Sequence, residues 1–240
     1  MLPFFDNLRT DLELLDQEIN QELKLKTGSI YELVPLRLDS VDYYLRPFLL
    51  LAISRAYGCR DKRAISVASV IQFIYLASRV HDIVHDNDQT EEFQFPVLVG
   101  DYLYGQFFLH LCQAEALSYL APLATTICQM HEGGILRQQF LAGKLDADIS
   151  EIDIVEKEEA MLFAVACKIG ASLGGASVQE QELFWRFGKY LGLGVTALSQ
   201  GLGKQVVGKA LRAAKDVLTL FPVPVPGLKE ISNFLEAQMT

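Results

Sequence analysis

An almost uninterrupted apolar stretch runs from Ser69 to Asp86 and reads SVIQFIYLASRVHDIVHD. It is longer than an ordinary strand and apolar on nearly every side, which predicts a helix in the centre of a protein. Asp82 and Asp86 stand four residues apart near its end, so their carboxylates share one helix face. A hard cation such as Mg²⁺, which prefers oxygen ligands, would relieve their mutual repulsion. The same spacing is also typical of a helix that simply ends in water, and spacing alone favours that simpler interpretation.

The rest of the chain carries the same helical pattern. Apolar residues recur every three or four positions, as between Leu8 and Leu23, while strict alternation is almost absent. The sequence therefore predicts an all-α protein, a single large helical bundle with central apolar helices. The segments apolar enough for a central position are Val67–Val84, Ala160–Leu173 and Tyr190–Leu198. The expected helices cover about 4–25, 40–57, 62–87, 92–117, 119–143, 151–174, 178–202, 205–219 and 227–238.

Composition narrows the classes of function. The chain has 240 residues, of which 50% are hydrophobic and 21% charged, so we expect one domain over residues 1–240. Its net charge of −9 disfavours nucleic acid as a partner. No secretory signal and no apolar run long enough for a transmembrane segment is recognisable, which predicts a cytoplasmic location. The scattered cysteines form no C-x-x-C pair and predict buried free thiols, at Cys59, Cys112, Cys128 and Cys167.

Other kinds of site find little support in the sequence. His81 and His85 could join Asp82 in a transition-metal cluster. A metal phosphohydrolase of the HD type would need a further histidine upstream, and none precedes His81. His110 and His131 are assigned no role. No G-x-S-x-G elbow and no phosphate-binding loop occurs, and the glycines between positions 192 and 203 predict close helix packing instead.

Arg46 precedes Pro47 and an apolar run, which predicts a helix start where the guanidinium could contact an anion. This segment is the first of four that resemble, in order, the trans-polyprenyl diphosphate synthase family. Weaker similarity near Glu132 and over Ala160–Phe163 extends the resemblance over roughly residues 40 to 200. The four segments are LRPFLL (45–50), the stretch from Ile71 to Asp86, VLVGDYL (97–103) and GKYLGLG (188–194).

The resemblance implies an isoprenoid synthase bundle in which two facing aspartate-rich motifs hold Mg²⁺ and draw off pyrophosphate. The first motif falls on Asp82, Ile83 and Asp86, so its middle aspartate is missing. The paired arginines that follow it in the family have no counterpart in residues 88–95. Of the residues that grip isopentenyl diphosphate, Arg46 remains, whereas the lysine of a later K-T-A segment falls on Glu158. The second motif falls on residues without carboxylates, namely Ser199, Gln200 and Gly203.

These losses indicate a shortened, degenerate synthase homologue, and we assign it no catalytic residue. The leading hypothesis is a non-catalytic or regulatory subunit, a homodimer or a heterodimer with a catalytic prenyl diphosphate synthase, with Mg²⁺ binding weak or absent. The helix at 92–117 corresponds to the family's dimer interface, and Ala77 and Ser78 correspond to positions that line the product tunnel. The alternatives are an active Mg²⁺-dependent prenyltransferase that condenses isopentenyl diphosphate with an allylic diphosphate, and an isoprenoid-binding protein.

Overall fold

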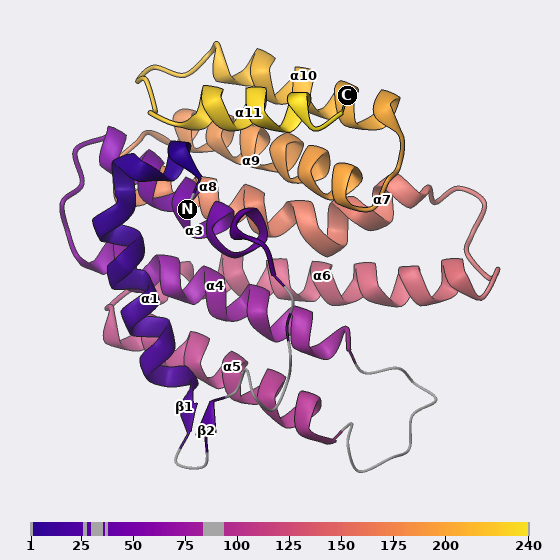
Figure 1. Ribbon diagram of the computed structural model, residues 1–240, viewed down its shortest axis with the longest axis horizontal. Helices are drawn as coiled ribbons and strands as arrows, with labels where there is room; N and C mark the ends of the chain where they lie inside the picture. The colour runs from indigo at the N-terminus through magenta and orange to yellow at the C-terminus, as the bar shows by residue number, and fades with distance from the viewer. Residues whose placement is uncertain (1, 26–27, 30–35, 37, 84–93, 240) are drawn as a thin grey trace.

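The computed structural model describes residues 2–25, 28–29, 36, 38–83 and 94–239 (Figure 1). Helices dominate this part of the chain, as the sequence predicts. In chain order the elements are η1 (Pro3–Leu8), α1 (Arg9–Leu23), β1 (Lys24–Leu25), β2 (Gly28–Ser29), α3 (Ser40–Ala56), α4 (Arg63–His81), α5 (Gln94–Gln113), η3 (Leu117–Tyr119), α6 (Leu120–Leu141), α7 (Glu151–Val155), the π-turn η4 (Glu156–Ala160), α8 (Met161–Leu173), α9 (Val178–Ser199), α10 (Lys204–Leu218) and α11 (Leu228–Ala237).

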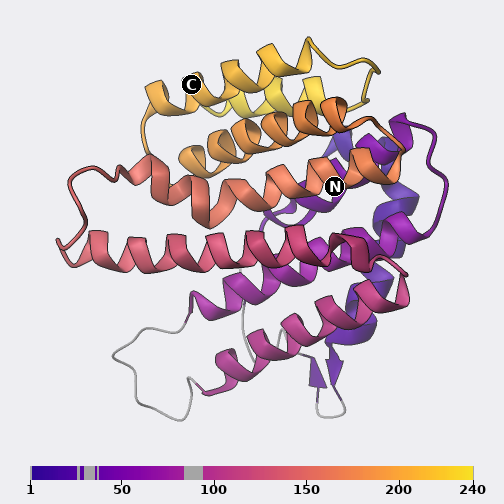
Figure 2. The same cartoon turned by 180° about the vertical axis from the view of Figure 1, so that it is seen from behind.

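The helices stack in layers around α4 and α8. In Figure 1, α10 and α11 lie above α9, α8 and α3 lie below α9, and α5 forms the opposite edge. Contacts between α8 and α9, α3 and α8, and α4 and α5 hold these layers together. Figure 2 shows α6 running alongside the continuous segment of α7, η4 and α8. Most of the buried apolar side chains form one connected cluster, which includes residues of every helix from α1 to α11 except α7.

The predicted helices are present, with four local differences. The helix expected over 62–87 ends at His81, so Asp82 caps it instead of lying within it, and residues 84–87 are outside the described part of the chain. Residues 151–174 bend through the π-turn η4 instead of forming one regular helix. The first and fifth predicted helices begin with the 3₁₀ turns η1 and η3. The sequence pattern also missed a two-residue antiparallel hairpin, in which Lys24 pairs with Ser29 and Leu25 with Gly28. Strands this short have no alternating pattern to detect.

Side-chain caps explain where several helices begin. Asp39 accepts hydrogen bonds from the backbone N–H groups of Val41 and Asp42, at 2.7 and 2.9 Å. Ser150 and Asp153 form a reciprocal capping box at the start of α7. Ser177 and Glu180 do the same for α9. Each cap satisfies backbone donors that have no partner inside the helix, and typically stabilises it by about 1 kcal/mol.

The prediction of central helices holds fully for α4 and α8 only. Among the described residues, α4 is the one helix whose length and composition would allow it to cross a membrane, yet 78% of that stretch is buried inside the bundle. Burial of this kind is typical of a core helix, so the finding is weak support for a membrane span. On α9, Tyr190, Leu193 and Leu198 are only partly buried, because they border hollows between α9 and α10.

The cysteine prediction also needs correction. All four cysteines are free thiols, as expected. Cys167 is buried, and its apolar surroundings raise the pKa of the thiol far above the usual range. Cys128, however, is exposed on α6, and Cys59 and Cys112 are only partly buried. An apolar sequence neighbourhood did not decide burial there, because an outer helix turns one side to solvent.

Glycines let the central helices approach one another closely. A Cβ added at Gly170 would lie 2.4 Å from the backbone oxygen of Leu50, which brings α8 against α3. One added at Gly192 would lie 2.7 Å from the Phe163 ring. The prediction of close packing is therefore confirmed at Gly192, but it is wrong at Gly201 and Gly203. Those two adopt positive φ angles of 68° and 94° in the turn before α10, with open space around them.

We expect Gly170→Ala to lower the free energy of unfolding by about 1–3 kcal/mol, because the added methyl group would collide with backbone atoms of Leu50. Gly105→Ala is the matched control, since a Cβ there meets nothing within 4 Å. That control should be neutral or stabilise by up to about 1 kcal/mol, because alanine favours helices more than glycine does. Urea denaturation followed by circular dichroism measures both. Equal stability of the two variants would contradict the close approach of α8 and α3.

Candidate functional site

Arg46 lies inside the bundle and not at a helix start. The helix α3 begins at Ser40, six residues earlier, where Asp39 caps it, so the predicted position was wrong. The guanidinium is stacked between two aromatic rings, 3.8 Å from the centroid of Tyr75 and 4.2 Å from that of Phe163. Its Nη1 donates to the backbone oxygen of Asp42 at 3.1 Å. With 3% of the residue exposed, this charge requires a counter-ion inside the protein.

Glu159 supplies that counter-ion and binds a second arginine as well. Its Oε2 accepts from Arg46 Nη2 at 2.7 Å, and its Oε1 lies 2.5 Å from Nη2 of Arg79. Arg79 in turn lies 2.5 Å from Oδ2 of Asp82. The side chain of Glu159 is 7% exposed, whereas those of Arg79 and Asp82 are 33% and 55% exposed. The four charges thus form a chain from the core to the surface, which we call the Arg46–Glu159 network.

The network shifts the pKa values of Arg79 and Asp82, its two more exposed members. Burial by itself would lower the pKa of Arg79, but the carboxylates of Glu159 and Asp82 raise it overall. The surrounding protein desolvates Asp82 and raises the pKa of its carboxyl, although Arg79 acts in the opposite direction. Both shifts follow from placing two carboxylates around one guanidinium with little water.

A second ion-pair cluster occupies the neighbouring surface of the site. Nη2 of Arg137 on α6 lies 2.8 Å from Glu158 Oε2, and its Nη1 lies 3.1 Å from Glu151 Oε1. The same Nη2 donates to Gln200 Oε1 at 3.2 Å, which links α6 to the end of α9. Burial raises the pKa of Glu158, and Arg137 acts against that shift. Glu158, which the resemblance places at a lysine position, is therefore already paired inside the chain.

The positions at which the resemblance places the second motif contribute no carboxylate. Ser199 is the last residue of α9, and its hydroxyl donates to the backbone oxygen of Thr196 at 3.0 Å. Gln200 caps the same helix end and accepts from Arg137. Gly203 precedes α10 with a φ of 94°. The turn from α9 to α10 thus holds one amide, one hydroxyl and a glycine where a metal-binding motif would need acids.

Asp82 lies beside a small cavity of about 50 Å³. The phenol of Tyr104 hydrogen-bonds His131 Nε2 at 3.2 Å, and the imidazole of His81 lies 3.6 Å from Asp101 Oδ1. Burial and the nearby His81 lower the pKa of His131, while burial and the carboxylates of Asp82 and Asp101 raise the pKa of Tyr104 to about 12. The cavity is lined by Ser78, Arg79, His81, Asp82, Met130, His131, Gly134 and Glu158.

The described residues do not by themselves complete the two-motif magnesium site that the resemblance implies. Within the described ranges, no group of three or more His, Cys, Asp or Glu side chains is arranged to hold a metal ion. Asp82 is bound to Arg79, and the facing turn carries no carboxylate. Asp86 and His85, and the stretch 88–93, lie outside the described residues. Of the two predicted tunnel residues, Ala77 is fully buried and Ser78 lines the small cavity.

The sequence pattern did not reveal that Glu159 is the partner of Arg46, or that the same carboxylate also binds Arg79. Arg79 interrupts a long apolar helix, and a charge at such a position must find a partner. Glu159 directly precedes the apolar stretch that begins at Ala160, where it ends up 6% exposed. Both signals were present, but the chain separation of 113 residues between Arg46 and Glu159 hides the pairing.

Comparison with known proteins identifies the class. The family described as Polyprenyl synthetase matches residues 43–194. A geranylgeranyl diphosphate synthase from Methanosarcina mazei is 26% identical and aligns with 95% of this chain and 78% of its own. An octaprenyl diphosphate synthase from Haemophilus influenzae is 28% identical over 88% of this chain and 69% of its own. The chain therefore belongs to the polyprenyl synthetase family, whose matching members are prenyltransferases of isoprenoid biosynthesis.

One solved structure carries the same fold with ligands present. A polyprenyl synthase from Caulobacter crescentus, complexed with calcium and isoprenyl diphosphate, superimposes with a TM-score of 0.81 at 19% identity. The match covers 98% of this chain and 97% of the other. A mint geranyl pyrophosphate synthase, described as heterotetrameric, gives a TM-score of 0.73 at 16% identity over 95% of this chain and 98% of its own. These likenesses confirm the isoprenoid synthase bundle.

We expect Glu159→Gln to destabilise the protein by about 3–5 kcal/mol, because it leaves the buried Arg46 without a counter-ion. Glu132→Gln is the control. Its carboxylate forms a 2.8 Å ion pair with Lys157 but is 57% exposed, so the loss should be below about 1 kcal/mol. Chemical denaturation of both variants gives the difference. A loss for Glu159→Gln as small as that for the control would show that Arg46 is not held by this pair.

Proposed function

We propose that this chain is a non-catalytic or regulatory subunit of a polyprenyl diphosphate synthase, folded as one domain over residues 1–240. The observation that carries the proposal is the position of Glu159. A diphosphate is recognised by cations, and the network pairs both Arg46 and Arg79 with this one buried carboxylate. The carboxylate of Glu159 thus occupies the two arginines that a substrate diphosphate would need.

The loss of metal ligands supports the same proposal. Stabilising a leaving diphosphate requires cations that neutralise the charge developing in the transition state, each worth several kcal/mol of barrier. Ser199, Gln200 and Gly203 carry no carboxylate. Glu158 adds a negative charge where a diphosphate would be repelled. We therefore expect Mg²⁺ binding to be weak or absent, and we place the protein in the cytoplasm with the pathway it belongs to.

An apolar surface on α5 and α6 supports pairing with another chain. Phe95, Leu98 and Phe108 on α5 are 54%, 63% and 49% exposed, although each is a large apolar side chain. Ile135 and Leu141 on α6 are 62% and 70% exposed. Large apolar side chains exposed on the surface in this number are typical of an interface. Its proposed occupant is a catalytic polyprenyl synthetase chain, and the heterotetrameric mint enzyme is a precedent for mixed assemblies in this fold.

The purified chain, supplied with Mg²⁺, isopentenyl diphosphate and allylic diphosphates of several lengths, should give no prenyl transfer. It should also bind inorganic pyrophosphate only weakly by calorimetry. Glu159→Gln removes one of the two carboxylates that bind Arg79 and the one that neutralises Arg46, and should bind pyrophosphate at least about tenfold more tightly. Turnover by the wild-type chain, or tight pyrophosphate binding before the substitution, would contradict the proposal.

The proposed pairing predicts that a charge introduced on α5 prevents complex formation, whereas a charge introduced on α9 does not. Leu98→Glu should abolish the complex with a catalytic homologue from the same source on gel filtration, because a carboxylate would be buried in an apolar interface. Val178→Glu is the control, since Val178 is 75% exposed but lies on α9. Neither variant should change the melting temperature of the isolated chain by more than a degree or two. Separate peaks for the wild-type mixture would overturn the pairing.

An active Mg²⁺-dependent prenyltransferase is the second candidate, and the position of Asp82 favours it. This carboxylate ends α4 beside the small cavity and is 55% exposed, so it is open to a cation. If the wild-type chain turns over, Asp82→Ala should abolish Mg²⁺-dependent activity, whereas Asp148→Ala, in an exposed loop, should leave it unchanged. Turnover that survives Asp82→Ala would exclude Asp82 as a metal ligand.

A further inference from the structure

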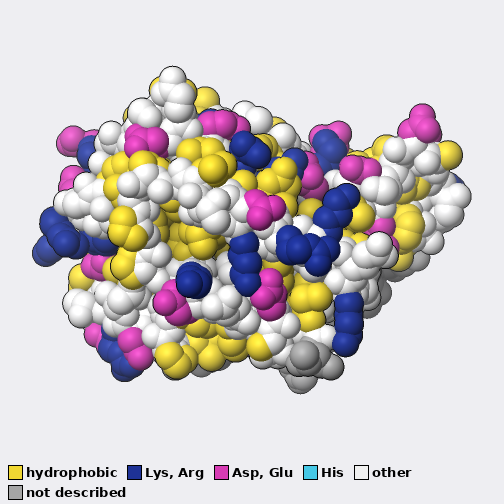
Figure 3. Space-filling view, turned by 90° about the horizontal axis from the view of Figure 1, so that it is seen from above, with side chains coloured by type: hydrophobic (Ala, Val, Ile, Leu, Met, Phe, Trp, Pro, Cys, Tyr) yellow, Lys and Arg dark blue, Asp and Glu magenta, His cyan; other side chains and the backbone are white. Residues whose placement is uncertain are grey.

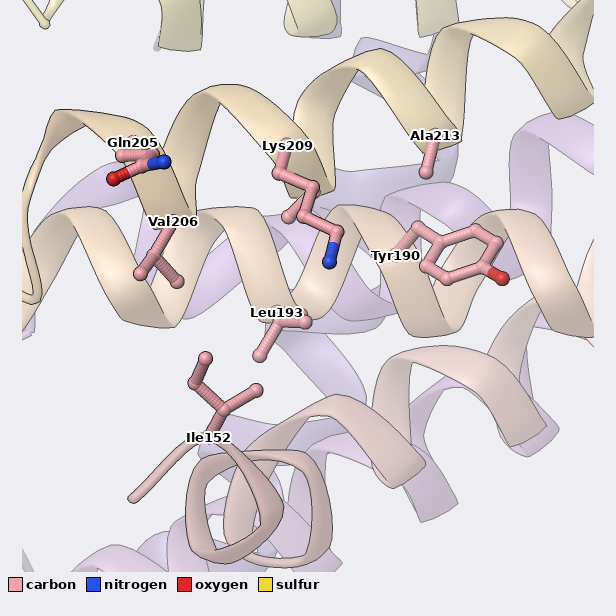
Figure 4. Close-up of a pocket in the computed structure, with 8 residues that line it drawn as sticks. Ile152, Tyr190, Leu193, Gln205, Val206, Lys209 and Ala213 are labelled. Carbon is pink, nitrogen blue, oxygen red and sulfur yellow. The ribbon is translucent and has the colours of Figure 1, made fainter. Parts of the chain in front are cut away.

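An apolar groove lies on the side of the bundle away from the Arg46–Glu159 network. It has a volume of about 550 Å³ and runs between α7, α9 and α10. In Figure 4, Ile152 rises from α7 toward Leu193 on α9, and Val206 points down from α10. Ala210 and Ala213 complete the wall of α10, and their short side chains leave the hollow open. This size and lining are typical of a small-molecule site.

A few polar groups border the groove, and one of them is a cation without a local counter-ion. Lys209 extends from α10 over the groove, and within the described part of the chain no ion pair or hydrogen bond of its ammonium is found. By contrast, Lys189 on α9 pairs with Glu156 at 2.7 Å, and Lys215 on α10 pairs with Glu236. Gln205 and Tyr190 add an amide and a phenol to the rim.

The surrounding surface is unusual for so acidic a chain. The net charge is −9, yet α10 exposes Lys204, Lys209 and Arg212. Figure 3, which views this side of the molecule, shows Lys and Arg side chains among hydrophobic ones. Lys209 is the one of these cations that lines the groove, and a lysine beside an apolar wall selects a ligand that is apolar along its length and anionic at one end.

We propose that this groove binds a single-chain anionic amphiphile, such as a prenyl monophosphate, as a site separate from the Arg46–Glu159 network. The hydrocarbon tail of the ligand lies against Leu193, Val206 and Ala210, where burial removes the tail's apolar surface from water. The anionic end pairs with Lys209, and Gln205 or Tyr190 donates to it. A small inorganic anion would leave the apolar walls uncovered, and a neutral lipid would leave Lys209 unpaired.

The test is calorimetric titration of the full chain with farnesyl monophosphate below its micelle concentration. The wild type should bind at one saturable site. Lys209→Gln should weaken binding at least about tenfold by removing the charge-assisted contact. Ala213→Phe should abolish binding by filling the groove, and circular dichroism checks that this variant folds. The control Lys204→Gln removes a neighbouring exposed lysine that does not line the groove and should bind as the wild type does.

Any one of three results would contradict the proposal. Farnesol binding as tightly as farnesyl monophosphate would show that Lys209 selects nothing. Equal affinity of Lys209→Gln and Lys204→Gln would place the ligand elsewhere. Binding to phosphatidylglycerol vesicles, without binding of the free amphiphile, would identify the face as a membrane contact instead. Since none of these readouts depends on prenyl transfer, they are independent of whether the chain is a catalyst.

Discussion

A carboxylate held between two guanidinium groups is the constraint on which the site depends. Glu159 can be buried only because Arg46 and Arg79 each neutralise one of its oxygens. Arg46 is tolerated in the core only because that carboxylate and the rings of Tyr75 and Phe163 replace its hydration. The pairing joins α3, α4 and η4, so that these three elements must meet at one point. Removing one member leaves a buried charge, whereas an apolar replacement of the whole group would cost far less.

The same electrostatics connects fold to function. A synthase of this family works on diphosphates, and its bundle has to present cations and metal-bound carboxylates to them. In this chain the described arginines of the site form ion pairs with internal carboxylates, Arg46 and Arg79 with Glu159 and Arg137 with Glu158. The turn that follows α9 offers Gln200 to Arg137 and no acid to a metal. These internal ion pairs are the physical basis of the proposed subunit role.

The fold matches solved structures at 16–19% identity, and close helix packing is one feature that holds it together in this chain. Gly170 and Gly192 admit the backbone of α3 and the ring of Phe163, and neither contact depends on the chemistry of the site. Packing positions and catalytic positions are thus physically separable in this bundle. The side of α9 that faces α10 shows what an apolar sequence pattern does not predict. Tyr190 and Leu193 are as apolar as core residues, yet they border an open groove, because α10 presents alanines there and leaves space.

The sequence by itself determined the helical class, the central positions of α4 and α8, the family, and the absence of carboxylates at Ser199, Gln200 and Gly203. All of these follow from local periodicity or from residue identity at a fixed place in a motif. Only the tertiary structure decided what Arg46 binds, that Arg79 and Glu159 complete its network, and that Cys128 is exposed. It also located the groove beneath Lys209. The reason is physical: periodicity reports which face of a helix is apolar, whereas pairing across 113 residues and the space between helices depend on how those faces meet.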